Sequence, residues 1–445
     1  MNKPIYHITP EKGWMNDPNG LVEYNGVYHV FYQADPEHLI NENIGWGHKI
    51  SSDLLHWEEC QPALLPDQSY DRDGCFTGSA VIKDDKMYLL YTGHVNQESG
   101  YIETQNLAVS KDGIHFEKYD GNPVIKNPPA DTTMRFRDPK IWEKNGNYYA
   151  VIGGETEDKC GKVVYYRSRD LQEYTYCGVF AESDGSIGNM WECPNFVQIG
   201  NTDVLIISPK GLEKENGFSA SFESGYMTGK MNYEEGMFSH ASYKKLDHGF
   251  DFYAPQVMEC GDRKILFAWF AIPDSPGIEM EDGWRHLLTI PRELKVASDN
   301  SLLMTPIEEL KKLRTKVLEK TVPGASWNCN IENQPLELLL TGRYEELCFE
   351  IADKNEPLLE LTLKKDNIVL KQKREDGWQI RTCSYYDDIM RKMQIYMDYS
   401  TIEVFINDGR YVFSSRIYPV GSLDFRINAA ADNEDGSLEI YSLSL

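Results

Sequence analysis

A segment of about 60 residues recurs five times along the first 295 positions of the chain, and no other feature constrains the fold as strongly. Each copy contains a Pro or Gly, an apolar strand, a hairpin turn and a second strand rich in aromatic residues. Consecutive marker residues lie 60, 61, 55 and 61 positions apart, at Pro18, Gly78, Pro139, Pro194 and Pro255. The period predicts one compact structural unit per copy.

A second pattern lies between these copies and completes the period. It reads "SSDLLHW" from 51, "SKDGIHF" from 110 and "SRDLQEY" from 168, with Asp53, Asp112 and Asp170 spaced 59 and 58 positions apart. Each period therefore holds about four short strands, which is the content of one propeller blade. The sequence predicts an all-β fold with a five-bladed β-propeller, because a β-sandwich of similar strands does not explain a repeat near 60 residues.

The turns inside the copies support this interpretation. Asn25-Gly26 and Asn145-Gly146 carry the strongest short hairpin signal, an Asn-Gly pair between two apolar strands.

In a propeller the first strand of each blade lines the central channel, so the residues that open the copies are expected to share one funnel. These residues are Asp17, Thr77, Asp138, Glu192 and Ala254.

One copy departs from the pattern. Asp17 and Asp138 directly precede the marker Pro, whereas Cys193 separates Glu192 from Pro194. One residue of offset turns a side chain to the other face of a regular strand. Either a local bulge in this copy or the longer Glu side chain is needed to bring the third carboxylate into the funnel.

Paired carboxylates across a cleft are the minimal equipment for cleaving a glycosidic bond. The acid must stay protonated, and apolar walls and nearby like charge raise its pKa. Trp191 precedes Glu192 and offers such a wall, while Asn16 offers Asp17 a hydrogen bond that favours the charged form. On these grounds Glu192 is the expected acid and Asp17 the expected nucleophile. Arg137 is expected to hold its neighbour Asp138 in the ionised state.

Other chemistries find less support. The chain has no Asp-x-Asp-x-Asp-Gly loop, no His-Glu-x-x-His pair and no Gly-x-Ser-x-Gly elbow, so we expect no metal, no cofactor and no serine nucleophile. Cys193 lies beside Glu192 without a His in the same motif, and a buried thiol that tunes its neighbour is the milder interpretation. Six aromatic residues recur near the expected funnel, each of which also suits a core position: Trp14, Trp46, Phe76, Trp191, Trp269 and Trp284. Trp14 and Trp46 lie beside glycine-rich and polar loops, which favours sugar contact.

The charge and cysteine content of the chain limit the classes of partner and the cell compartment that we expect. The formal net charge of −25 and the pI near 4.8 argue against nucleic acid or an anionic membrane as a partner, since both reward basic surface. The nine cysteines are scattered without a Cys-x-x-Cys pair, which indicates free thiols in a reducing compartment. The N-terminal segment has no apolar core typical of a signal peptide, and no stretch is apolar enough to span a membrane. We therefore expect a cytoplasmic protein that acts on a small sugar; a homo-oligomer is left open.

The motifs in this order and spacing resemble those of glycoside hydrolase family 32, which comprises invertases, sucrose-6-phosphate hydrolases and fructan hydrolases. The matching segments are "WMNDPNG" at 14–20, "FYQ" at 31–33, "WGH" at 46–48, "FTGSA" at 76–80, "RDP" at 137–139, "ECPN" at 192–195 and "DFYAPQ" at 251–256. In the C-terminal part, "MDYSTIEVFINDGR" at 397–410 resembles the signature of the family's β-sandwich. The resemblance covers nearly the whole chain.

The resemblance implies a retaining β-fructofuranosidase. Asp17 would attack the anomeric carbon, Glu192 would act as acid and base, and Asp138 would bind fructose hydroxyls and stabilise the transition state. Asn16, Gln33, Trp46, Phe76, Thr77 and Arg137 match positions that shape the fructose pocket of the family, and Trp14 and Trp269 complete the expected substrate contacts. Thr77 stands where relatives often have Ser, and Lys210 where they often have Gln; the lysine adds positive charge on the leaving-group side.

The remaining chain is expected to form a second domain. We predict a propeller over residues 1–300, a linker with a short helix over 301–317 and a β-sandwich over 318–445. The helix is expected in "TPIEELKKLR" at 305–314, with Thr305 as its cap, Pro306 in its first turn and Glu308 completing a capping box. The alternating apolar pattern beyond it is typical of antiparallel strands, and no catalytic residue is assigned there.

Four functional hypotheses follow. The first is a hydrolase of sucrose or sucrose 6-phosphate, and the second is an exo-hydrolase of fructans or fructooligosaccharides. The third is a non-catalytic fructan-binding propeller, which the three intact acids argue against. The fourth is an inverting arabinose-cleaving relative, in which the two carboxyl groups would lie about 6.5–9.5 Å apart instead of about 5–5.5 Å.

Overall fold

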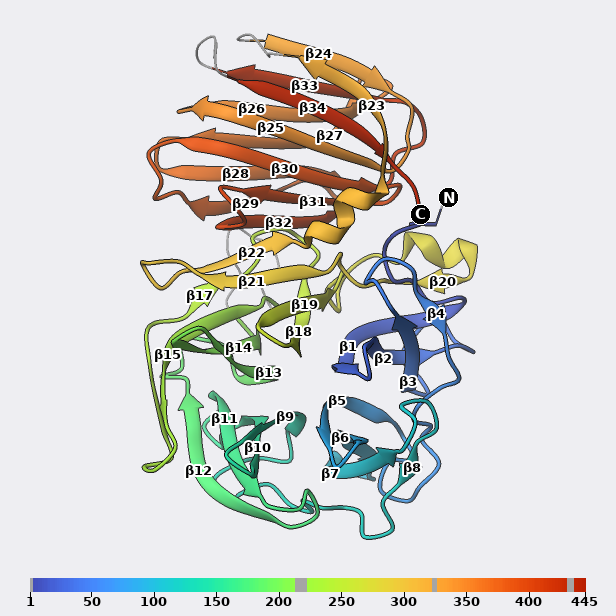
Figure 1. Ribbon diagram of the computed structural model, residues 1–445, viewed down its shortest axis with the longest axis vertical. Coiled ribbons are helices and arrows are strands. Elements are labelled where there is room, and N and C mark those ends of the chain that lie inside the picture. The colour runs from blue at the N-terminus through green and yellow to red at the C-terminus, as the bar shows by residue number, and fades with distance from the viewer. Residues whose placement is uncertain (1–2, 213–221, 322–325, 430–435) are drawn as a thin grey trace. The chain divides into compact units, whose positions relative to one another are not determined.

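The computed structural model of the protein describes residues 3–212, 222–321, 326–429 and 436–445, and this part of the chain is nearly all β (Figure 1). Its only helices are two short 3-10 helices, η1 (Ile278–Asp282) and η2 (Glu308–Leu313). No helix among the described residues is long and apolar enough to cross a membrane. The position of the functional site is therefore determined by strands and the turns between them.

The chain divides into two compact units that interleave in sequence. Residues 8–245 and 253–300 form the N-terminal unit, whereas residues 1–7, 246–252 and 301–445 form the C-terminal unit. Buried carboxylates hold the two short segments in the C-terminal unit. Asp398 accepts hydrogen bonds from the backbone N–H groups of Ile5 and Tyr6, and Asp251 accepts one from the backbone of Arg416.

Five antiparallel sheets build the N-terminal unit, one for each sequence repeat, as the strand content of the period predicts (Figure 1). The first contains β1 (Gly13–Tyr24), β2 (Val27–Asp35), β3 (Gly45–Ser51) and β4 (Glu58–Glu59), with β20 (Trp284–Arg285) parallel to β1. The second contains β5 (Cys75–Lys83), β6 (Lys86–Asn96), β7 (Tyr101–Ser110) and β8 (Glu117–Lys118). The third contains β9 (Phe136–Lys144), β10 (Asn147–Glu155), β11 (Gly161–Ser168) and β12 (Tyr174–Glu182). The fourth contains β13 (Met190–Ile199), β14 (Thr202–Lys210), β15 (Gly225–Asn232), β16 (Met237–His240) and β17 (Lys244–Lys245). The fifth includes β18 (Tyr253–Cys260), β19 (Arg263–Trp269) and β21 (Arg292–Val296).

The first strands of these sheets contact one another in sequence order. Strand β1 packs on β5, β5 on β9, β9 on β13 and β13 on β18, and β18 in turn contacts β1. In Figure 1 the five sheets run from blue through green to yellow around one centre. The segments that open the five repeats therefore meet at this centre, although they are about 60 residues apart in the chain.

The cores of the N-terminal unit lie between neighbouring sheets. Between the third and fourth sheets, Trp142 and Tyr149 pack with Phe196 and Leu205. Equivalent clusters of aromatic and aliphatic side chains lie between the first and second sheets and between the second and third. Full burial of each such side chain contributes about 1.5–3 kcal/mol, so packing between the faces of neighbouring sheets holds this unit together.

Two of the sequence motifs form turns in the first three sheets. Asn25-Gly26 and Asn145-Gly146 have positive φ at both positions, as a tight two-residue hairpin requires. In the second pattern, Asp53 accepts hydrogen bonds from the backbone N–H groups of Leu55 and His56, so it closes the turn that follows the third strand. The corresponding aspartates of the next two repeats, Asp112 and Asp170, make the same pair of bonds.

The C-terminal unit consists mainly of two six-stranded antiparallel sheets. In spatial order one contains β23 (Arg314–Thr321), β34 (Ser437–Leu443), β25 (Leu336–Tyr344), β30 (Met390–Asp398), β31 (Thr401–Ile406) and β32 (Tyr411–Arg416). The other contains β24 (Ser326–Ile331), β33 (Leu423–Ala429), β26 (Leu347–Asp353), β27 (Glu356–Lys364), β28 (Asn367–Arg374) and β29 (Gly377–Ser384). A single apolar core draws on strands of both sheets, including Leu338, Phe349, Ile395 and Phe425.

The helix expected over 305–314 is shorter and of a different type. Thr305 lies in strand β22 (Leu302–Pro306), and η2 begins after Ile307 without a side-chain cap, so the predicted capping box is wrong. The buried residues Ile307, Leu310 and Leu313 are spaced three apart. That spacing places them on one side of a helix with three residues per turn, which explains the 3-10 geometry.

Candidate active site

A pocket of about 450 Å³ opens where the first strands of the five sheets meet. Its wall contains ten of the residues singled out from sequence: Trp14, Asn16, Asp17, Gln33, Phe76, Arg137, Asp138, Glu192, Lys210 and Trp269. All three predicted carboxylates are among them. The pocket has the size usual for a small-molecule site, and its lining is unusually rich in ionisable groups.

Every repeat brings two consecutive residues to this centre, and not one. In the five copies these pairs are Asn16-Asp17, Phe76-Thr77, Arg137-Asp138, Glu192-Cys193 and Tyr253-Ala254. The pairing between first and second strand shifts register at this point in all five sheets, so the bulge is general and not particular to the fourth copy. Cys193, and not Glu192, is thus the register equivalent of Asp17, which corrects the expected alignment.

The bulge is accompanied by unusual backbone conformations in three copies. Asp138, Cys193 and Ala254 have φ of 66°, 49° and 50°, in the left-handed region that residues with a Cβ rarely adopt. Such conformations cost about 1–3 kcal/mol each and persist where the surrounding structure imposes them. Here they let both members of a pair lie near the centre, which a regular strand would prevent.

Asp17 ends a chain of hydrogen bonds that links the first and second sheets. The Trp14 indole N–H donates to Asn16 Oδ1 at 2.6 Å, and Asn16 Nδ2 donates to Gln33 Oε1 at 2.6 Å. Gln33 Nε2 donates to Thr77 Oγ1 at 2.7 Å, which leaves the Thr77 hydroxyl to donate to Asp17 Oδ2 at 2.6 Å. The chain fixes the carboxylate and orients one oxygen.

Burial raises the pKa of Asp17 to about 6, and repulsion from Glu192 adds to this, while the bonds from Thr77 and Asn16 pull the pKa down. Asn16 Nδ2 lies 3.1 Å from Asp17 Oδ1, which agrees with the expected donor. The charged form is nevertheless less favoured than the sequence suggested, because removal from water outweighs two hydrogen bonds.

Asp138 lies in the same buried group. Its Oδ2 accepts a hydrogen bond from the backbone N–H of Cys193 at 2.9 Å, and the Cys193 thiol lies 3.5 Å from an oxygen of both Asp138 and Asp17. Burial raises the pKa of Asp138 to about 7, against the attraction of Arg137 and with added repulsion from Glu192 and Asp17. The thiol therefore separates two carboxyl groups that share one weakly hydrated space.

Glu192 is surrounded by donors instead of apolar walls. Arg137 Nη2 donates to Glu192 Oε1 at 2.5 Å, the Tyr253 hydroxyl donates to Oε2 at 2.7 Å, and Lys210 Nζ lies 3.8 Å from Oε1. Burial alone would raise the pKa of Glu192, but Arg137 and Lys210 lower it to about 2.

Two sequence expectations about these charges are therefore wrong. Arg137 forms its ion pairs with Glu192 and Glu103, and not with its neighbour Asp138. Trp191 turns into the core between the third and fourth sheets, where its Nε1 donates to the carbonyl of Ile187, so it builds no apolar wall around Glu192. Trp191 and Glu192 point to opposite sides of the strand, which explains the second error. The first arises because burial of Asp138 outweighs the attraction of Arg137.

The remaining residues predicted to contact the substrate differ in whether they line the pocket. Trp46 is fully buried between the first two sheets and donates to the Phe76 carbonyl at 3.1 Å, and it is not among the pocket-lining residues. Thr77 is also buried and contacts Asp17 directly. Trp269 lines the pocket, and its buried Nε1 has no hydrogen-bond partner among the residues the structure describes.

Several pocket residues were missed in the sequence. They include Asn41, Ile44, His94, Tyr101, Glu103, Arg135, Tyr253 and Pro273. Tyr253 carried a usable signal, because it occupies the repeat position equivalent to Asn16. Glu103 and His94 carried none, since they come from the second and third strands of their sheet and reach the centre only through the fold.

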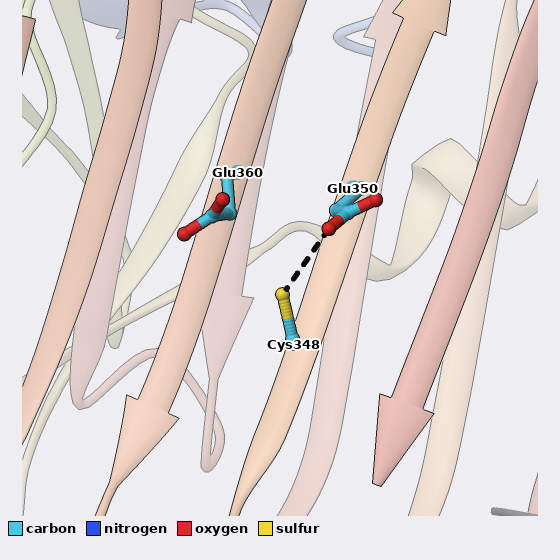
Figure 2. Close-up of side chains that lie close together, drawn as sticks. All are labelled: Cys348, Glu350 and Glu360. Atoms are coloured by element: carbon cyan, nitrogen blue, oxygen red, sulfur yellow. Dashed lines mark hydrogen bonds between the residues drawn. The ribbon is translucent and has the colours of Figure 1, made fainter. Parts of the chain in front are cut away.

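A group of possible metal ligands lies in the C-terminal unit, outside this pocket. Figure 2 shows Cys348 and Glu350 on β26 beside Glu360 on β27, with their ligand atoms within 4.8 Å of one another. Lys371 Nζ contacts Glu360 at 2.8 Å, and Arg426 lies 3.8 Å from Glu350. Cations of the protein already neutralise both carboxylates, so we assign no metal to this group.

Comparison with known proteins agrees with the geometry of the pocket. The model of the glycosyl hydrolases family 32 N-terminal domain matches residues 7–306, and that of the family 32 C terminal matches residues 369–444. A sucrose-6-phosphate hydrolase of Bacillus subtilis is 37% identical over 93% of this chain and 88% of its own length, and a raffinose invertase of Escherichia coli is 37% identical over 94% and 89%. A β-fructofuranosidase of Bombyx mori has a similar structure, with a TM-score of 0.90 and 34% identity over 99% of this chain and 94% of its own. A sucrose-6-phosphate hydrolase of Lactobacillus gasseri has a TM-score of 0.89 and 28% identity, over 99% and 93%. The chain therefore belongs to glycoside hydrolase family 32.

Proposed function

We propose that the protein is a retaining β-fructofuranosidase that hydrolyses sucrose or sucrose 6-phosphate. The observation that carries this proposal is the meeting of Asp17, Asp138 and Glu192 in one pocket, each with a different set of hydrogen-bond donors. The names of the relatives, sucrose-6-phosphate hydrolase and raffinose invertase, support the substrate class. So does a structurally similar variant of the Bombyx mori enzyme that was solved with sucrose.

The proposed reaction has two steps with balanced proton transfer. In the first, Asp17 attacks the anomeric carbon of the fructosyl unit while Glu192 gives its proton to the leaving oxygen. The bond from the anomeric carbon to this oxygen breaks, and an ester of Asp17 forms. In the second step Glu192 takes a proton from water, and the water oxygen replaces Asp17 at the same carbon. The donor from Thr77 orients Asp17, which supports the proposed role of Asp17 as nucleophile.

Asp138 is proposed to bind fructose hydroxyls and to stabilise positive charge that develops on the sugar ring. Trp14, Asn16, Gln33, Phe76, Arg137 and Trp269 are the proposed fructosyl contacts, since all line the pocket. Thr77 acts through Asp17, and Trp46 supports the wall from the core, so neither is proposed to touch the sugar.

The fold proposal is a five-bladed β-propeller over most of residues 1–300 and a β-sandwich over 318–445. The closed order of contacts among the five first strands supports the propeller. The single apolar core shared by the two six-stranded sheets supports the sandwich. Segment 301–317, expected as a linker, supplies β22 and η2. All nine cysteines are free thiols, which supports the proposed cytoplasmic location.

The test is fructose release by the purified protein. We expect turnover of sucrose or sucrose 6-phosphate, a loss of about 10⁴-fold or more in kcat for Asp17→Asn, and a loss of about 10²–10⁴-fold for Glu192→Gln. In the presence of methanol, NMR should show the β-configured methyl fructoside as the first product, whereas an inverting enzyme would not give it. Comparing kcat/KM on sucrose, sucrose 6-phosphate, kestose and inulin separates this proposal from a fructan exo-hydrolase. Fructoside binding without any release of fructose would refute catalysis.

A further inference from the structure

Arg137 lies between two buried carboxylates, of which the proposed reaction uses only one. Its Nη2 donates to Glu192 Oε1 at 2.5 Å, while its Nη1 donates to both oxygens of Glu103, at 3.1 and 3.3 Å. The side chains of Arg137, Glu192 and Glu103 are 11%, 13% and 1% exposed. One guanidinium therefore bridges an acid that must change its protonation and an acid that does not react.

Glu103 is held firmly where it stands, on β7 of the second sheet. Its Oε2 accepts the backbone N–H of Phe136 at 2.9 Å, and His94 Nδ1 lies 3.4 Å from its Oε1. Phe76 stacks on the His94 ring with 4.3 Å between centroids, which fixes the imidazole in turn. Burial acts to raise the pKa of Glu103, but Arg137 and His94 outweigh it and keep the pKa below its ordinary value. Glu103 thus remains a carboxylate.

The contact of Arg137 with both Glu103 and Glu192 resolves a problem in the proposed mechanism. Glu192 must carry a proton to act as an acid, and a protonated Glu192 no longer balances the charge of Arg137. A buried cation that loses its only partner is strongly destabilising. Glu103 offers two further oxygens within hydrogen-bond distance, so Arg137 keeps a counter-ion when Glu192 is neutral.

We propose that Glu103 is a positioning residue that retains Arg137 during the reaction and so allows Glu192 to take up and give its proton. The inference rests on the proposed function. Without Glu103, the guanidinium has Glu192 as its remaining close anion and holds it in the charged form. The same bridge keeps Arg137 at the pocket wall, where its nitrogen can bind a sugar hydroxyl once Glu192 is protonated.

The charges that face this group come from six strands. They are Asp17 on β1, His94 on β6, Glu103 on β7, Arg137 and Asp138 on β9, Glu192 and Cys193 on β13 and Lys210 on β14, with the Tyr253 hydroxyl on β18. Neutralising Glu103 removes one negative charge from this set. Glu192 then faces Arg137 and Lys210 with less opposing charge, so its pKa falls and it loses its proton at lower pH.

The test compares Glu103→Gln with the wild-type protein on two substrates of different acid demand. Sucrose has a sugar oxygen as leaving group and needs the acid, whereas p-nitrophenyl β-fructofuranoside has a leaving group that departs without it. We expect kcat on sucrose to fall about 10–100-fold, a part of the usual contribution of general acid catalysis, and kcat on the aryl fructoside to fall less than about threefold.

Glu155→Gln is the matched control. Glu155 is also buried and pairs with an arginine of the pocket, Arg135, at 3.2 Å, but it has no contact with Arg137 among the described interactions. This variant should keep the wild-type substrate ratio. If Glu103→Gln does not fold, Glu103→Asp keeps the charge at a greater distance and should show the same substrate-dependent loss in weaker form.

Equal losses on both substrates would overturn the inference and leave Glu103 a purely structural role. A wild-type protein that releases fructose from neither substrate would instead overturn the proposed function, and this inference with it. The two failures are therefore distinguishable in one set of assays.

Discussion

Thr77→Val tests how the pocket controls the nucleophile. The Thr77 hydroxyl donates to Asp17 Oδ2 at 2.6 Å, and valine keeps the shape of the side chain while removing the donor. A hydrogen bond to a charged group contributes about 1.5–3 kcal/mol. At 1.36 kcal/mol per pKa unit, its loss raises the pKa of Asp17, now about 6, by about 1–2 units.

The sign follows from the role of Asp17. It attacks as a carboxylate, so the ionised fraction of Asp17 falls as the pH drops through its pKa, and a higher pKa moves this fall to higher pH. At pH 6 the ionised fraction should drop from about one half to about 1–9%, which lowers kcat/KM about 5–50-fold. At pH 8 the variant should lie within about twofold of the wild type in this fraction.

The assay is the pH dependence of kcat/KM for sucrose in wild type, Thr77→Val and Thr77→Ser. Thr77→Ser keeps the hydroxyl, so its kcat/KM relative to the wild type should not change between pH 6 and pH 8. A loss in Thr77→Val that is the same at pH 6 and at pH 8 would refute the reasoning. In that case the hydroxyl would matter for packing or for Gln33, whose Nε2 donates to Thr77 Oγ1, and not for the charge of Asp17.

Two further predictions concern stability. His7 lies fully buried, 2.9 Å from both Asp398 and Glu403; burial alone would lower its pKa, but these carboxylates raise it above the ordinary 6.5. The stabilisation by protonated His7 is therefore complete below pH 6.5 and is lost as the pH rises through the raised pKa. His7→Gln should lose about 3–5 kcal/mol of unfolding free energy, so its Tm deficit should be largest at pH 5.5 and shrink toward pH 9. A Tm deficit that does not depend on pH would contradict this. In Gly153→Ala the new Cβ would lie 2.1 Å from the Trp191 carbonyl oxygen, which belongs to the backbone and cannot turn aside. Urea unfolding should show a loss of about 1–3 kcal/mol, and an unchanged midpoint would show that the third and fourth sheets separate more easily than their packing suggests.

The sequence by itself determined the repeat and most of what the repeat implies. The spacing near 60 residues gave five sheets of short strands, the Asn-Gly pairs gave their hairpins, and Asp53 with its counterparts gave the turns after the third strands. Asp17, Asp138 and Glu192 were identified before their positions were known, and all three line one pocket. These features are local, or they follow a fixed period, and so they can be found along a one-dimensional string.

Only the tertiary structure decided the pKa values of the three carboxyl groups in the pocket. Burial raises the pKa of Asp17 and Asp138, while Arg137 and Lys210 lower the pKa of Glu192. The reason is that a pKa depends on what surrounds a group within a few ångströms, and alternate residues of a strand face different surroundings. Glu103 is a second example of a feature that the sequence does not reveal. It lies 34 positions before Arg137 and outside every repeated motif, and only the meeting of two sheets places its carboxylate against the guanidinium.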